Sequence, residues 1–452
     1  MLSSRLPKDL SPSPFFAELE RVKAQVSAET ARGEGLPFID MTVSSPVKAG
    51  LPVEMDAAVE SARSGFGCWN PDAAGWKSAR EAVVEYYRER GGNFTAGQIL
   101  LTASTSEAYS VLFKTFCDPG DVILTPMPGY PLLDTLAQLE HLECAPYFLQ
   151  LRRENARKLA TDERREGAAF RFVLDTDSLL AAPEKAKIVL LVSPHNPTGH
   201  CVSREEWNAA VRFCEENDMV LVVDEVFGDY ALTDKVKRTW EYVFGLCPPE
   251  PSLSQSSPSK SFSTEGRESI HCRFNDFWDA GGNDLIDLPE DGPKCPIFWL
   301  NGLSKAVGSP QLKLGWMAFY APREHFEEIR AALEFVEDAY LSVSAPAQAL
   351  GSALLKQSAA YESRVKERLL QNWQTLREAF PAKYCPEVLG GWYAVVRLGE
   401  DDEDLTLRLL REKHVLVQPG FFFDFDEDGW VVISLLQEPA IFKEAVRRMA
   451  DR

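Results

Sequence analysis

Residues 297–317 read Ile-Phe-Trp-Leu-Asn-Gly-Leu-Ser-Lys-Ala-Val-Gly-Ser-Pro-Gln-Leu-Lys-Leu-Gly-Trp-Met, and they give the clearest indication of the architecture of this chain. The apolar run from Ile297 to Leu300 is typical of a strand in a parallel sheet. Small and polar residues follow, so Lys305 stands where the strand would deliver side chains to a site. A lysine that has lost its solvent can act as a free amine and form a Schiff base with an aldehyde. Most lysines are solvated surface charges, so this hypothesis needs partners elsewhere in the chain.

Two more apolar runs end in polar residues. The run from Lys187 to Val192 is followed by Ser-Pro-His-Asn-Pro-Thr-Gly, which places Asn196 at the carboxyl end of a strand. The run from Met219 to Val223 is followed at once by Asp224. Because a carboxylate is costly next to buried apolar residues, we expect Asp224 to have a cationic or hydrogen-bonding partner. His195 has two interpretations, a contact with the site or a local hydrogen bond to the backbone.

A third strand end predicts an anion site. The short strand from Ile99 to Thr102 runs into Ser-Thr-Ser-Glu, which opens a helix. Backbone N–H groups and the helix dipole converge at such a junction, and Thr105 and Ser106 add two hydroxyls. A plain Ser/Thr N-cap is the alternative interpretation. Further along, the proline-braced loop 126–131 holds Tyr130, either as a stacking platform or as a core tyrosine.

Strand–helix alternation in the middle of the chain and helix-rich ends predict an α/β fold. We expect three α/β/α layers around a mostly parallel sheet in a large cofactor-binding domain over residues 45–325. A smaller α+β domain is expected from residues 1–44 plus 326–452. The charged stretch from Arg152 to Arg171 is expected to be exposed, residues 348–380 to form one long helix, and residues 246–296 to be a loop-rich insertion.

Composition and charge narrow the function. The chain of 452 residues has a net charge of −20 and a pI near 4.9, which argues against nucleic acid or an anionic membrane as the main partner. No run approaches the roughly 18 apolar residues of a membrane span, and the first residues lack a signal-peptide core, so a cytoplasmic location is expected. Nine cysteines without a Cys-x-x-Cys pair indicate reduced thiols and no metal site.

These side chains form one ordered set that matches the contacts of pyridoxal phosphate. A protonated ring nitrogen makes that cofactor an electron sink, and a buried carboxylate keeps the proton in place. The matching residues are Thr105 and Ser106 for the phosphate, Tyr130 for a ring face, Asn196 for the phenolic oxygen, Asp224 for the ring nitrogen and Lys305 for the aldehyde.

The motifs Asn-Pro-Thr-Gly at 196–199, Asp224-Glu225 and Ser304-Lys305 stand in the order of a known family. Over nearly its whole length the chain resembles the class I and II aminotransferases, which are fold-type I pyridoxal-phosphate enzymes, and it is most similar to a bacterial alanine/aspartate aminotransferase-like subgroup. The resemblance implies a homodimer with shared active sites and a lysine that is both Schiff-base anchor and proton shuttle. It also places Glu107 and Ser304 among the cofactor contacts.

Departures from the family pattern mark the substrate groove and the phosphate site. Lys313 stands where the family usually has a phosphate-clamping arginine, so the charge is kept but the bidentate fork is lost. Phe227 replaces a tyrosine that bonds the phenolic oxygen, and Trp69 a tyrosine that reaches the neighbouring phosphate. Val432 aligns with the arginine that binds the substrate carboxylate, and Ser45 stands where the subgroup often has Asn-Pro. We assign Ser45 and Trp69 to substrate binding.

Three functions compete. The first is an aminotransferase that moves an amino group from an amino acid or related amine to a 2-oxo acid by a ping-pong mechanism, with Lys305 and Asp224 catalytic. The second is a pyridoxal-phosphate-dependent lyase or decarboxylase, which the missing arginine favours. The third is a catalytically weak cofactor-binding sensor or interaction protein, although the N-terminal residues show no basic DNA-binding helix pair.

Overall fold

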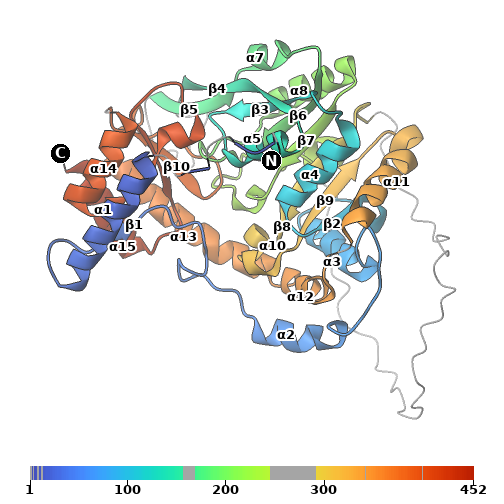
Figure 1. The fold of residues 1–452 in the computed structure, drawn as a ribbon, viewed down its shortest axis with the longest axis horizontal. Helices are drawn as coiled ribbons and strands as arrows, with labels where there is room; N and C mark the ends of the chain where they lie inside the picture. Colours follow the sequence, from blue (N-terminus) through green and yellow to red (C-terminus); the bar gives the residue numbers. More distant parts are fainter. Residues whose placement is uncertain are drawn as a thin grey trace.

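A mixed eight-stranded sheet forms the centre of the molecule (Figure 1). The computed structural model describes the chain except residues 1, 2, 4, 8, 9, 12, 13, 156–167, 245–291, 342, 400 and 452. The strand order is β2-β9-β8-β7-β6-β3-β4-β5. The strands are β2 (Ile99–Thr102), β3 (Val122–Met127), β4 (Glu143–Asn155), β5 (Ala168–Leu174), β6 (Ala186–Val192), β7 (Val220–Asp224), β8 (Ile297–Gly302) and β9 (Gly315–Tyr320).

The strands in the middle of the sheet run parallel, and its margins are antiparallel. Strands β4, β3, β6, β7 and β8 pair in parallel, while β9 is antiparallel to β2 and β8, and β5 to β4. Register puts Val192, Asp224 and Leu300 side by side. Thr102 and Gly302 both pair with Gly315. The residues that follow β2, β6, β7 and β8 therefore emerge at one edge, as expected for parallel strands.

Helices cover both faces of the sheet, which confirms the predicted α/β/α layers. Successive strand residues point to opposite faces. Leu100, Ile188 and Val222 pack in one core with α4 and α11, while Leu101, Val189 and Val223 pack in the other with α3 and α8. The helices on these faces are α3 (Lys77–Arg88), α4 (Thr105–Phe116), α5 (Leu132–Leu139), α7 (Thr176–Leu180), α8 (Arg204–Asn217), α11 (Arg323–Tyr340), α12 (Ala345–Leu355) and α13 (Ser358–Ala379).

Helix α1 (Pro14–Ala31) packs with the C-terminal helices and strands at one end of the molecule (Figure 1). It buries Phe15, Leu19, Val22 and Val26 with Leu410 of α14 (Asp402–Lys413). Strands β10 (Tyr393–Arg397), β12 (Gln418–Pro419) and β13 (Trp430–Ser434) form a small antiparallel sheet, and β1 (Ile39–Asp40) pairs with β11 (Val415–Leu416). This packing supports the predicted division into two domains, which stays a prediction.

Shorter helices and the last helix complete the fold. They are α2 (Asp56–Ala62), η1 (Arg63–Gly65), η2 (Ala96–Gln98), η3 (Gly228–Tyr230), α9 (Glu241–Phe244), α10 (Leu303–Ala306), η5 (Pro310–Leu312), η6 (Gly420–Phe423) and α15 (Pro439–Ala450). No helix within the described ranges is long and apolar enough to cross a membrane. The described residues also contain no group of three or more His, Cys, Asp or Glu side chains placed to hold a metal ion.

One local prediction holds only in part and another is wrong. Residues 156–167 of the charged stretch 152–171 lie outside the described residues; Arg152 and Arg153 are exposed as expected, but β4 and β5 form an antiparallel pair here that buries Ala169. Charged residues on one side of an edge hairpin hide the alternation that marks it as strand. Residues 348–380 form two helices, since α12 ends at Leu355 and α13 begins at Ser358. Most of the predicted insertion at 246–296 lies outside the described residues.

Candidate active site

Lys305 follows β8 within the short helix α10, at the edge where the parallel strands end. Its Nζ lies 4.8 Å from the ring centroid of Trp392 and 5.3 Å from that of Phe227. Burial lowers the pKa of the Lys305 amine to about 8, and the nearby Asp224 carboxylate opposes this shift. A lysine held in this way provides far more free amine near neutral pH than a solvated one does.

Asp224, the last residue of β7, has the hydrogen-bonding partner that the sequence led us to expect. The Tyr109 hydroxyl donates to its Oδ2 at 2.6 Å, and the backbone N–H of Val226 donates to Oδ1 at 3.0 Å. Burial raises the pKa of Asp224, whereas these two donors and the charge of Lys305 pull it down. A carboxylate accepts about four hydrogen bonds, so room remains for another donor.

The junction between β2 and α4 forms a helix N-terminus that can receive an anion. Ser104 is the N-cap, and its Oγ accepts from the N–H of Glu107 at 3.2 Å. Thr105 and Ser106 occupy the first turn. The Glu107 carboxylate accepts from the N–H of Ala103, so its interaction here is with the backbone.

The start of β9 packs closely against this helix end. A Cβ on Gly315 would lie 3.0 Å from the carbonyl carbon of Ser104 and 3.1 Å from the nitrogen of Thr105, so this close approach requires glycine. Lys313 lies two residues earlier, in a left-handed conformation (φ 53°) with an exposed side chain. Chain connectivity thus brings Lys313 near the predicted phosphate site.

Asn196 and Tyr130 lie on two loops that His195 joins. The Asn196 loop and the Tyr130 loop both contain cis prolines. The His195 Nδ1 lies 2.9 Å from the Thr198 hydroxyl, and the pKa of His195 is lowered to about 3 by burial and by His200, despite a hydrogen bond to the backbone of Pro128. The local hydrogen bond of His195 is therefore to a side chain, and its interaction with the backbone reaches the Tyr130 loop; a contact of His195 with the site stays a prediction. The amide oxygen of Asn196 is buried without a hydrogen-bond partner within the described residues.

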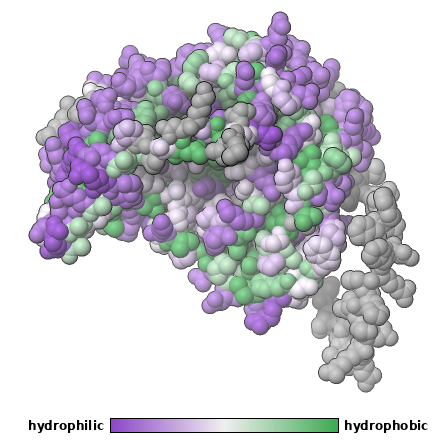
Figure 2. Space-filling view, in the orientation of Figure 1, coloured by the Kyte–Doolittle hydropathy of each residue, from purple (hydrophilic) through white to green (hydrophobic). Residues whose placement is uncertain are grey.

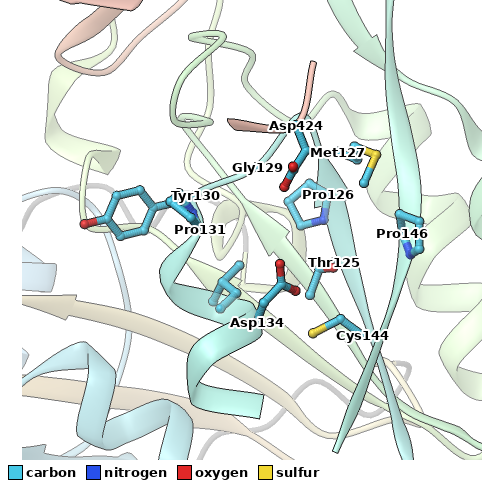
Figure 3. A pocket seen from close by; sticks show the side chains of 11 residues that line it. Thr125, Pro126, Met127, Gly129, Tyr130, Pro131, Asp134, Cys144, Pro146 and Asp424 are labelled. Atoms are coloured by element: carbon cyan, nitrogen blue, oxygen red, sulfur yellow. The ribbon is translucent and has the colours of Figure 1, made fainter. Parts of the chain in front are cut away.

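A cavity of about 180 Å³ lies behind the Tyr130 loop rather than around Lys305. Figure 3 shows the Tyr130 ring pointing away from this cavity, while the carboxylates of Asp134 and Asp424 lie around it. Burial and the charge of Asp134 raise the pKa of Asp424. Tyr130 is 48% exposed, so its ring is open to a ligand on its other side. The core-tyrosine interpretation of Tyr130 is therefore wrong.

In the described part of the chain, the predicted substrate residues Ser45 and Trp69 make no hydrogen bond or ring contact with Lys305. The Ser45 hydroxyl accepts from the N–H of Lys48 at 3.5 Å and so belongs to a turn. Trp69 is 80% exposed. Val432 is fully buried in β13 and pairs with Val395 and Gln418, so no cation stands at that position.

Several residues at the site were not expected to act there. Trp392 contributes a ring beside the lysine, and the Tyr230 hydroxyl donates to the backbone oxygen of Lys305 at 2.6 Å. No role was predicted for Tyr109 from the sequence. Its spacing of three and four residues from Ser106 and Thr105 places all three on one side of α4, which is the sequence signal that could have revealed it.

A network of buried charged residues lies next to the ends of β7 and β8. Arg238 bonds Glu225 at 2.8 Å and Asp229 at 2.9 Å, and Arg90 also bonds Asp229 at 2.8 Å. Tyr86 links Asp229 to β8, because its hydroxyl accepts from the Asn301 amide at 3.1 Å. Paired charges of this kind are costly to break, so the network fixes the ends of β7 and β8 relative to each other.

Glu337 provides a pH-dependent test of the packing of α11 on α4. It is 2% exposed, and burial together with Glu107 raises its pKa from 4.5 to about 8. Between these values the folded state binds more protons than the unfolded chain, so Glu337 lowers the free energy of unfolding as pH rises. Glu337→Gln should therefore be more stable than the wild type at pH 9, by roughly 4 kcal/mol, and similar to it at pH 4.5.

Urea unfolding at several pH values measures this difference. Glu328→Gln, an exposed change on the same helix, is the matched control and should leave the pH dependence unaltered. A stability difference for Glu337→Gln that does not vary with pH would contradict the protonated, buried carboxyl.

The assembled residues fit pyridoxal phosphate. A helix N-terminus with two hydroxyls suits a phosphate, and a buried carboxylate with free acceptor capacity suits a protonated ring nitrogen. The buried Asn196 amide oxygen, which has no partner among the described residues, can accept from a ring substituent that donates, such as a phenol hydroxyl, and the desolvated Lys305 suits an aldehyde. All four groups lie at or just after the ends of strands that finish at the same edge of the sheet.

Comparisons with known proteins agree. The family model "Aminotransferase class I and II" matches residues 50–268 and 271–449. The glutamate-pyruvate aminotransferase AlaA of Haemophilus influenzae is 22% identical over 439 residues, covering 92% of this chain and 91% of that protein. The S-alkyl-thiohydroximate lyase SUR1 of Arabidopsis thaliana is 22% identical over 410 residues, covering 87% and 74%. The crystal structure of an aspartate aminotransferase from Thermotoga maritima has a TM-score of 0.71 at 20% identity, covering 100% and 99%.

The family match spans most of the chain, and that family consists of pyridoxal-phosphate-dependent enzymes. The fold and the residues at the ends of the parallel strands agree with this match, and the chain belongs to the class I and II aminotransferases.

Proposed function

We propose that this protein is a pyridoxal-phosphate-dependent aminotransferase that moves an amino group from an amino acid or related amine to a 2-oxo acid by a ping-pong mechanism. The observation that supports this most directly is the desolvated amine of Lys305 close to the Asp224 carboxylate at the edge of the sheet. A free amine and a ring-nitrogen partner are the two groups that the chemistry needs.

Each residue has a role in the proposed mechanism. Bound pyridoxal phosphate supplies an electron-withdrawing ring that stabilises negative charge on the substrate carbon. Lys305 would hold the cofactor through its aldehyde, and its free Nζ would accept the proton that leaves the substrate carbon. Asp224 holds the proton on the ring nitrogen. Thr105, Ser106 and Lys313 bind the phosphate.

The remaining side chains orient the ring and the substrate. Tyr130 covers one ring face, and the Asn196 amide bonds the phenolic oxygen. The aromatic rings of Phe227 and Trp392 exclude water from the amine. Tyr393 of β10 is buried and its hydroxyl interacts with Ser44, the residue that precedes the predicted substrate residue Ser45 in the sequence.

A lyase is the second candidate, because the fully buried Val432 leaves no guanidinium at the predicted carboxylate-binding position. A substrate held mainly by its side chain fits this site as well as an α-amino acid does. The relative SUR1 is named as a lyase, whereas AlaA is named as an aminotransferase, so proteins similar to this chain include both reaction types.

Product stoichiometry separates these candidates. Cofactor-loaded protein is mixed with alanine, glutamate, phenylalanine, a thioether amino acid or benzylamine, without a 2-oxo acid. An aminotransferase should release about one equivalent of oxo product per site and resume only when pyruvate or 2-oxoglutarate is added, because the amino group stays on the cofactor. Release of many equivalents of product per site without a 2-oxo acid would establish the lyase. If no amino donor gives any product, the cofactor-binding protein without turnover is favoured.

A homodimer and a two-domain organisation are part of the proposal. Val47, Phe66 and Trp69 are 51%, 40% and 80% exposed, and large exposed apolar side chains often mark subunit contacts. Figure 2 shows apolar side chains gathered over the lower part of the visible face. Light scattering tests the dimer, and Trp69→Asp should shift it toward monomers if this surface is the contact. We propose residues 45–325 as the large domain and residues 1–44 plus 326–452 as the small one.

A further inference from the structure

Tyr109 is a buried tyrosine that bonds the side chain of a residue of the proposed active site. Its hydroxyl donates to Asp224 Oδ2 at 2.6 Å, a contact between residues 115 positions apart in the sequence. The side chain is 3% exposed and its ring packs on Phe113, with centroids 6.1 Å apart. Burial and the negative charge of Asp224 raise the pKa of Tyr109 well above its usual value. The hydroxyl therefore keeps its proton and acts as the donor.

The hydrogen bond changes how strongly Asp224 attracts a proton. Burial by itself makes the carboxylate more basic, and neighbouring Glu225 adds to this effect. Tyr109, the N–H of Val226 and Lys305 act in the opposite direction. A donor to a charged carboxylate stabilises the charged form, so Tyr109 reduces the proton affinity of Asp224.

That proton affinity matters because a proton between a carboxylate and a pyridine nitrogen resides on the more basic partner. If the proton moves to the carboxylate, the ring loses its positive charge and withdraws electrons less strongly. We propose that Tyr109 is a positioning residue that keeps Asp224 ionised and thereby keeps the bound cofactor protonated at its ring nitrogen. This inference rests on the proposed function.

The same helix would then hold both ends of the cofactor. Thr105 and Ser106 lie in the first turn of α4, where the phosphate is proposed to bind, and Tyr109 follows one turn later. Residues four apart lie on one side of a helix. Helix α4 thus fixes the distance between the phosphate site and the carboxylate that faces the ring nitrogen.

The direct test is nitrogen NMR of protein loaded with pyridoxal phosphate labelled with ¹⁵N in the ring. Wild type should show a protonated ring nitrogen, and Tyr109→Phe should move the resonance toward the unprotonated position. Turnover should fall roughly tenfold to a hundredfold, the range for a hydrogen bond to a charged group. Tyr147→Phe is the matched control, because this buried tyrosine donates to the backbone oxygen of Leu190 at 2.9 Å, and it should leave the resonance in place.

A double-mutant cycle tests whether Tyr109 acts through Asp224. In an Asp224→Asn background, Tyr109→Phe should have little further effect on turnover, whereas independent roles would multiply the two losses. If Tyr109→Phe does not fold, 3,5-difluorotyrosine at position 109 keeps the shape and strengthens the donor, so the ring nitrogen should stay protonated to higher pH.

The outcomes separate the inference from the proposed function. Wild type that binds no labelled cofactor would overturn the proposed function. Wild type with a protonated nitrogen, together with a Tyr109→Phe resonance that does not move, would overturn the role of Tyr109 alone. If the turnover losses of Tyr109→Phe and Asp224→Asn multiply in the double mutant, the role of Tyr109 is also overturned.

Discussion

Replacing Lys305 with alanine should abolish turnover, with a loss of roughly a thousandfold or more, since general acid–base catalysis alone contributes about 10²- to 10⁴-fold. The variant also loses the nucleophile that attaches the cofactor, so borohydride should no longer fix pyridoxal phosphate to the protein. Mass spectrometry of the reduced protein measures this attachment. Lys356→Ala, which changes an exposed lysine at the end of α12, is the control and should behave like wild type.

The same variant tests the environment of the amine. The pKa of Lys305 is lowered from 10.5 to about 8, so between these values the unfolded chain binds more protons than the folded protein. The free energy of unfolding of the wild-type apoprotein should therefore rise with pH over that window. Lys305→Ala should lack this rise. Equal pH slopes in both proteins would mean that Lys305 is solvated, and full cofactor attachment in the variant would place the anchor elsewhere.

The ends of the central strands could be predicted from sequence because each signal is local. An apolar run followed directly by Asn, Asp or Lys describes a buried parallel strand and the residue at its end. Asn196, Asp224 and Lys305 indeed follow β6, β7 and β8, and register sets these ends side by side. Their chemical roles stay predictions, since position alone does not show what they bind.

The partners of these residues could not be predicted in the same way. Tyr109 lies on an apolar helix face, where periodicity indicates core, and only folding brings its hydroxyl to Asp224. Arg90 and Arg238 look like ordinary surface charges in the sequence, yet both bond the buried Asp229. Contacts between distant residues depend on how elements pack, and local patterns contain little information about that.

The departures from the family pattern remain informative after the fold is known. The Lys305 amine lies over the Phe227 ring, which has no hydroxyl such as a tyrosine would offer. This increases the desolvation of the lysine and helps to explain its lowered pKa. Val432 is likewise buried among apolar strand residues. Both positions therefore carry apolar side chains where the family pattern has polar ones.

Asp224→Asn should separate function from stability. The amide keeps the shape but cannot balance a protonated ring nitrogen, so turnover should fall by about a hundredfold to a few thousandfold, the equivalent of the 3–5 kcal/mol that breaking a buried charge pair costs. Burial raises the pKa of Asp224, which means that the apoprotein holds this carboxylate at a cost in stability. The asparagine apoprotein should therefore melt at the same temperature as the wild type or higher at pH 7.

This combination of lost turnover and retained stability is what distinguishes a catalytic carboxylate from a structural one. A structural aspartate, such as Asp229 between Arg90 and Arg238, should instead lose stability when changed to asparagine, because two guanidinium groups would each lose one of their carboxylate partners. Thermal melts and steady-state rates of both variants make the comparison. If Asp224→Asn destabilises the apoprotein as much as Asp229→Asn does, the carboxylate at the end of β7 serves the fold, and the ring-nitrogen role must be given up.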